Sequence, residues 1–239
     1  MKKLWEKFNT LTAECYMDMV RVNSGMEVWD ACYNLLLTII SQGRETDAAF
    51  APELYCLDED TDYEYDVENW LEDYLDELDM ADRYADLESV CRKLLTLFAW
   101  KEEDPSDLYF RISAALGSQG KKEEALAYCE EWYKQDSGNM AAAAALIYVR
   151  IGVRDWAGAE DMVKRYIADD MVCTDENEII FVAASALYKA SKNKKAEKKI
   201  NKALETYERE IEEYFMGMDE EELEFAVDYD SDEEDLPFR

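Results

Sequence analysis

The chain has 239 residues, a formal net charge of −31 and no histidine, and these properties exclude several kinds of site. Such a charge repels phosphate backbones and anionic lipid surfaces, so we expect neither nucleic acid nor a membrane as partner. Without an imidazole, serine–histidine or cysteine–histidine catalysis and histidine-containing metal sites are excluded. Eight glycines and three prolines leave little material for a turn-rich β protein, which favours helices.

The six cysteines are widely scattered, and no two are separated by only two residues. Several fall on apolar positions of helical patterns, so we expect buried, reduced thiols. The first residues lack the apolar stretch of a signal peptide. The longest apolar run, residues 35–40, is far shorter than the ~20 residues that span a bilayer. The sequence therefore predicts a soluble, cytoplasmic protein.

Residues 1–66 are predicted to form a helix pair followed by an acidic loop. The apolar stripe of the first helix consists of Leu4, Phe8, Leu11 and Cys15. The stripe of the second helix consists of Val28, Cys32, Leu35 and Ile39. Gly43 is predicted to follow the end of the second helix. The acidic run over residues 58–66 should repel itself and form a mobile loop.

Residues 67–216 contain a motif that returns at nearly fixed spacing, in which a turn precedes an alanine that opens an amphipathic helix. The three alanines are Ala125, Ala159 and Ala196, separated by 34 and 37 residues. A period near 34 residues is typical of stacked helical hairpins. We expect hairpins over residues 106–139, 140–173 and 177–210, and a more divergent one over residues 68–101.

This pattern resembles the tetratricopeptide repeat (TPR) family, clearly over residues 106–210 and more loosely over 68–101. Besides the three alanines, the matching positions are Ser113, Trp156, Ala184 and Ala203. The chain departs from the family where Trp132 and Tyr166 replace alanine and Ile147 replaces glycine. The resemblance implies an all-α fold, a right-handed superhelix of stacked antiparallel helix hairpins. A long helix over residues 194–216 would cap it, and we expect a monomer or weak dimer.

The resemblance also implies a groove on the concave side, lined by the first helix of each hairpin. The implied groove residues are Asp107, Phe110, Ala114, Tyr148, Ile151, Glu178, Phe181, Ser185 and Tyr188. Their aromatic rings would anchor a partner, and the small residues would leave room for its backbone. The acidic surface would steer basic partners toward the groove. Alternatively, some of these side chains belong to the core.

Two charged segments have open interpretations. A basic patch on the predicted capping helix consists of Lys194, Lys195, Lys198, Lys199 and Lys202. This patch is either a solvated surface or a docking site for an acidic ligand, including the protein's own tail. The tail, residues 217–239, alternates acidic and apolar residues and is predicted to be disordered. It either solubilises the protein, folds on binding, or occupies the groove.

No glycine-rich phosphate loop is present, and the acidic runs lack the glycine and glutamate that a calcium loop requires. We therefore expect no cofactor and no metal. The sequence predicts a non-catalytic protein–protein interaction module, an adaptor or chaperone-like protein that binds a partner peptide or helix. The alternative is a polyanionic regulatory protein that imitates phosphate and sequesters a basic or nucleic-acid-binding partner.

Overall fold

The computed structural model describes residues 1–19, 25–168 and 172–216, and within these ranges the chain forms eleven helices and no strand. The all-α prediction is confirmed for this part of the chain. None of the described helices is both long and apolar enough to cross a membrane. The chain divides into two compact units, unit 1 over residues 1–108 and unit 2 over residues 109–239. The predicted boundary after residue 66 therefore lies inside unit 1.

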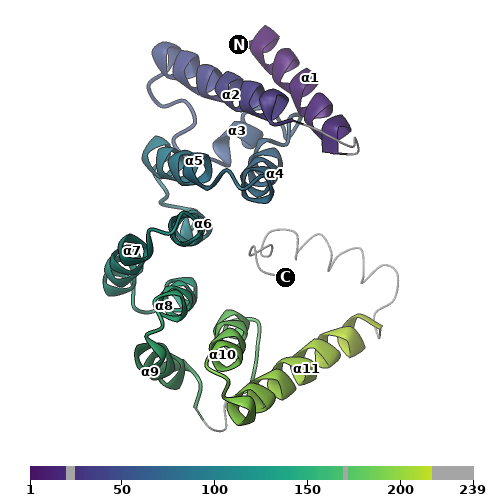
Figure 1. Cartoon of the computed structure of the whole chain (residues 1–239). Helices are drawn as coiled ribbons and strands as arrows, with labels where there is room; N and C mark the ends of the chain where they lie inside the picture. The colour runs from purple at the N-terminus through teal and green to yellow at the C-terminus, as the bar shows by residue number, and fades with distance from the viewer. Residues whose placement is uncertain (20–24, 169–171, 217–239) are drawn as a thin grey trace. The chain divides into compact units, whose positions relative to one another are not determined.

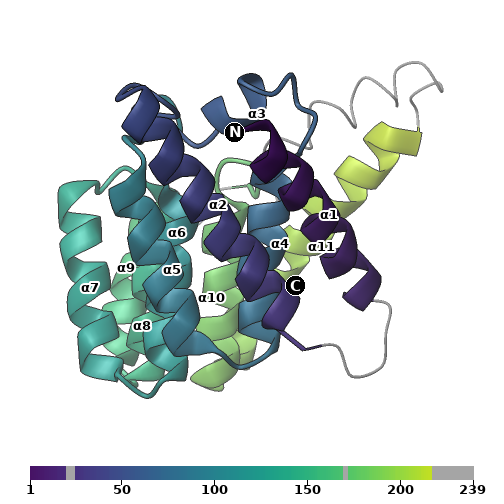
Figure 2. The ribbon, with the colours of Figure 1, turned by 90° about the horizontal axis from the view of Figure 1, so that it is seen from above.

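Unit 1 is built around a cluster of aromatic rings. Its helices are α1 (Lys2–Met19), α2 (Glu27–Thr46), α3 (Cys56–Glu59), α4 (Val67–Met80) and α5 (Tyr84–Leu97). Helices α1 and α2 pack side by side (Figures 1 and 2), as the sequence predicts. The Trp70 ring of α4 lies 5.2 Å from Phe8 of α1 and 6.0 Å from Trp29 of α2, measured between ring centroids. These rings connect three helices into one core.

Two predictions for the N-terminal region are wrong in detail. Gly43 does not end α2 but lies within it, buried under the ring of Phe50. A Cβ atom at this position would stand 2.2 Å from that ring. The acidic run is not a self-repelling loop throughout, because it contains part of α3. The Asp58 carboxylate accepts hydrogen bonds from the amides of Val67 and Glu68 at 2.7 and 3.0 Å, which caps the start of α4.

Unit 2 has the helices that the repeat pattern predicts, except that residues 106–108 of the first one fall on the unit 1 side of the division. They are α6 (Ser106–Ser118), α7 (Lys122–Gln135), α8 (Met140–Gly152), α9 (Trp156–Tyr166), α10 (Glu178–Ala190) and α11 (Lys194–Met216). Figure 1 shows α6, α8 and α10 in one row and α7 and α9 in another, with α11 beside α10. The centre of this unit is the alanine run 142–145, whose four residues are at most 1% exposed.

The hairpins α4–α5, α6–α7, α8–α9 and α10–α11 close with the same turn. In each, one residue has left-handed backbone geometry, and these residues are Asp82, Gly120, Arg154 and Lys192, with φ of 57, 77, 63 and 60°. The amide of the next residue then donates to the carbonyl five residues earlier, at 2.8–3.0 Å. This hydrogen bond is typical of helix C-termini. The shared turn recurs every 34 or 38 residues and occurs in both units.

The departures from the family pattern are accommodated by aromatic contacts. Trp132 of α7 stacks on Tyr109 of α6 with ring centroids 5.2 Å apart. The Tyr166 hydroxyl of α9 donates to the Tyr133 hydroxyl of α7 at 2.9 Å. The large side chains at these two positions thus make direct contacts between neighbouring helices. Alanine, which the family pattern has there, would make no such contacts.

Candidate protein interaction surface

All nine predicted groove residues lie on α6, α8 and α10, the row of first helices of the unit 2 hairpins. Helix α8 packs against α7, α9 and α10, and the residues from Ala142 to Ile147 are all buried. A helix that is apolar on every side is normally enclosed in this way. The row therefore offers only a narrow strip of accessible surface.

Three of the predicted aromatic anchors lie in the core of unit 2. Phe110, Phe181 and Tyr188 are 2, 1 and 9% exposed. The Phe110 ring meets the ring of Tyr148 edge to face, with centroids 6.1 Å apart. The prediction that these three rings stand open to a partner is wrong, because neighbouring helices already cover them. They belong to the alternative left open by the sequence, side chains of the core.

The other predicted groove residues are half-buried. Those of unit 2 are Ala114, Tyr148, Ile151, Glu178 and Ser185, which we name the A-helix face. Asp107 is also half-buried, in the first turn of α6, but it falls on the unit 1 side of the division. The Ser185 hydroxyl donates to Asn201 Oδ1 of α11 at 2.6 Å. Binding of a partner by this face stays a prediction.

The A-helix face combines the small side chains of Ala114 and Ser185 with the larger ones of Tyr148 and Ile151. Burial raises the pKa of Tyr148 to about 12, so its phenol is neutral at physiological pH. Glu178 adds an acidic group at the start of α10. The face therefore combines apolar surface with one acidic group.

Sequence reasoning missed the hydrogen-bonded arginine at the end of α8. Arg150 Nη1 donates to the carbonyl of Gly158 at 2.8 Å, and its Nη2 and Nε lie 3.7 Å from Glu130 and 3.8 Å from Asp155. It therefore connects α8 with α7 and with the start of α9. The available signal was an arginine near the end of an otherwise apolar helix, since a charge there requires partners.

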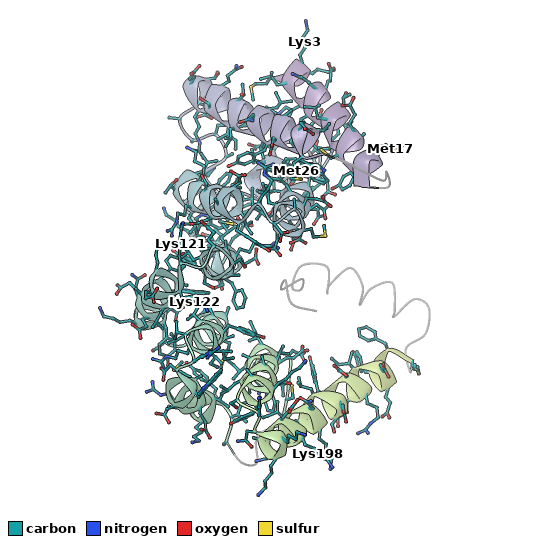
Figure 3. The ribbon with its side chains drawn as sticks, in the orientation of Figure 1. Lys3, Met17, Met26, Lys121, Lys122 and Lys198 are labelled. Carbon is teal, nitrogen blue, oxygen red and sulfur yellow. The ribbon has the colours of Figure 1, made fainter. Side chains whose placement is uncertain are left out.

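The predicted basic patch is brought together on the first half of α11. All five lysines, 194, 195, 198, 199 and 202, are exposed, and we name them the lysine patch. In Figure 3, Lys198 lies on the side of α11 that faces away from α10.

The cysteine thiols have the environment of structural side chains. Five are buried, as the sequence predicts, and Cys56 is half-buried. Burial raises the pKa of both Cys129 and Cys173 to about 12, so these thiols are protonated at neutral pH and weakly nucleophilic. Across the described residues, no group of three or more cysteine, aspartate and glutamate side chains is arranged to hold a metal ion.

The fold defines an all-α protein built from helical hairpins with a shared turn. No protein-family model matches this chain, and comparison with curated proteins and with solved structures finds no similar protein. The resemblance to the tetratricopeptide family therefore depends on the repeat period and the small residues of the sequence alone, and it stays a prediction.

Proposed function

We propose that this chain is a non-catalytic protein–protein interaction module of the tetratricopeptide type, which binds a peptide or helix of a partner on the A-helix face. The repeated turn of the three hairpins of unit 2 carries the proposal. Repeated hairpins stack their first helices and leave one continuous strip of surface, which is the usual binding site of such solenoids. The small side chain of Ala114 leaves space there for a partner backbone.

The proposed partner is basic and partly apolar. The net charge of −31 attracts cations over a long range, and Glu178 gives the face itself an acidic group. Salt screens such attraction, with a Debye length of about 10 Å at 0.1 M and about 3 Å at 1 M. Association should therefore slow as salt is added. Association that is equally fast at low and high salt would contradict the electrostatic part of the proposal.

Matched substitutions on the two rows of helices test the binding surface. The first variant, Ala114→Arg with Ile151→Arg, places bulky side chains on the A-helix face. The control, Ala127→Arg with Ala157→Arg, makes the same change in charge on exposed positions of α7 and α9. Both are used as bait in pull-downs from the native cell extract, with circular dichroism to compare folding.

The proposal requires that the first variant loses partners that the control retains, with helix content unchanged in both. Partners that bind the first variant but not the control would indicate a binding surface on α7 and α9. That result would refute the proposal.

The second candidate is the polyanionic regulator, which the charge of −31 favours. Such a protein would bind a nucleic-acid-binding partner by imitating phosphate, and its acidic residues would do most of the binding. Deletion of residues 217–239 distinguishes the two functions. Loss of partners on this deletion, with binding unaffected by arginines on the A-helix face, would favour the polyanionic regulator.

A further inference from the structure

The charged side chains of α11 are arranged opposite to what its helix dipole favours, with lysines near the N-terminus and glutamates near the C-terminus. The lysine patch occupies the first half, whereas the second half contains Glu205, Glu208, Glu210, Glu212 and Glu213. The N-terminus of a helix carries partial positive charge and its C-terminus partial negative charge, so both halves meet charge of their own sign. An anion held at the start of α11 would relieve this repulsion.

Four lysines of the patch lack an acidic partner. Lys194, Lys195, Lys198 and Lys202 make no ion pair within the described part of the chain. Elsewhere, cations on helices do have such partners: Lys164 lies 3.1 Å from Glu160, and Arg92 lies 2.9 Å from Glu88. A concentrated positive surface is thus left open on a protein that is otherwise strongly acidic.

We propose that the lysine patch binds the acidic segment Asp228–Asp235 of the same chain. This segment contains Asp228, Asp230, Asp232, Glu233, Glu234 and Asp235 and no basic residue. Its charge is opposite to that of the patch, and bound at the start of α11 it would supply the anion that the helix dipole favours.

The length of chain between the two segments permits this contact. At ~1.5 Å per residue, Lys202 and Lys194 lie ~21 and ~33 Å before Met216 along α11. Asp228 follows Met216 by 12 residues, which extend to at most ~40 Å at ~3.3 Å per residue. The acidic segment therefore reaches both ends of the patch. A short tether also keeps it at a millimolar effective concentration, well above that of a separate molecule.

The contact gives the two segments a joint role. With the acidic segment bound, the lysine patch is closed to other anions, which suits a protein whose proposed partners are basic. The inference does not depend on the A-helix face, so either proposal can fail without the other.

Backbone amide NMR signals of residues 228–235 in the ¹⁵N-labelled full chain test the contact. The patch variant carries Lys194→Gln, Lys195→Gln, Lys198→Gln and Lys202→Gln. In about 20 mM salt, the signals of residues 228–235 in the patch variant should match those of the unaltered chain in about 500 mM salt. The reason is that the four substitutions and the added salt each remove the attraction between the patch and the segment. Signals that are identical in the unaltered chain and the patch variant at low salt would overturn the proposal.

Two controls exclude a general effect of charge and binding between molecules. The control variant removes the same charge from exposed positions of unit 1 and should leave the signals of residues 228–235 unchanged. It carries Lys2→Gln, Lys3→Gln, Lys7→Gln and Lys93→Gln. A tenfold dilution should also leave them in place. If the signals of residues 228–235 shift in this control variant, the effect comes from the overall charge of the protein. If they shift on dilution, the segment binds a second copy of the chain. Either result overturns the proposal.

A charge exchange guards against a patch variant that merely misfolds. The first variant should displace the segment, and it carries Lys194→Glu, Lys195→Glu, Lys198→Glu and Lys202→Glu. The second variant adds Asp232→Lys, Glu233→Lys, Glu234→Lys and Asp235→Lys to the first. It should restore the salt-sensitive signals of the segment. Failure of this second change to restore them, in a chain whose helix content is intact, would also contradict the contact.

Discussion

The cores of the two units are built from different side chains. Unit 1 packs large rings, with Trp29 and Trp70 each 1% exposed, whereas unit 2 packs its rings around a run of alanines from 142 to 145. Small side chains let helices approach at a similar distance each time, which suits a repeated hairpin. Large rings leave large cavities when they are truncated. We therefore expect unit 1 to be sensitive to truncation and unit 2 to enlargement.

The largest expected effect is Trp70→Ala in unit 1. Removing this ring opens a cavity among Phe8, Trp29 and Tyr74, and such changes cost about 3–5 kcal/mol. Urea unfolding followed by circular dichroism measures the loss. Trp156→Ala in unit 2 is the control, because Trp156 is only half-buried and should cost less. Equal losses of unfolding free energy for Trp70→Ala and Trp156→Ala would contradict the expectation that unit 1 is the more sensitive unit to truncation.

Alkaline pH should weaken both units through one tyrosine in each, the buried Tyr33 of unit 1 and the half-buried Tyr148 of unit 2. Burial raises the pKa of Tyr33 in unit 1 and of Tyr148 in unit 2 to about 12, above the usual 10. The stability that each contributes is present below pH 10 and is lost as pH rises through 12, by up to about 2–3 kcal/mol.

Tyr33→Phe and Tyr148→Phe should each make the fall in melting temperature between pH 10 and 12 smaller. A fall unchanged by both substitutions would show that other groups cause it. Tyr33→Phe should also stabilise the protein at neutral pH, because the Tyr33 hydroxyl is buried without a hydrogen-bond partner among the described residues.

Ala143→Leu tests sensitivity to enlargement in unit 2. Ala143 is fully buried, so added methyl groups must displace neighbouring helices, at a cost of about 1–3 kcal/mol. The control is Ala157→Leu on the exposed side of α9, which should be near neutral since leucine and alanine favour helices similarly. Denaturant midpoints compare them, and a neutral Ala143→Leu would mean that this alanine core is loosely packed.

The smallest expected effects concern the shared turn. Gly120→Ala should destabilise unit 2 by about 1 kcal/mol, because alanine resists the left-handed φ of 77°. Arg154→Gly should stabilise it by about 0.5–1 kcal/mol, since Arg154 adopts the same geometry at φ of 63° without being glycine. Thermal melts of both variants provide the measurement. Shifts of the same sign would show that the two turns are not equivalent.

Much of unit 2 was predictable because its signals are local. The start of α6 at Ser106 and of α11 at Lys194 follow from turn residues and the spacing of alanines. The apolar stripe of α1 was predicted only in part. Phe8 and Cys15 are buried as expected, but Leu4 and Leu11 are half-buried, whereas Trp5 and Thr12 are buried. Helical periodicity permits either of these adjacent stripes, and the stack of Trp5 on Tyr65, 5.0 Å away, favours the second.

The sequence by itself determined the helices, the recurring turn and the gathering of lysines on α11, because these depend on residues within one or two helical turns of each other. Tertiary structure alone decided which aromatic rings are covered. Phe110 and Phe181 occupy positions that the repeat pattern assigns to a groove, yet both are buried. Burial is decided by contacts between helices distant in the chain, and no local pattern records how closely those helices pack.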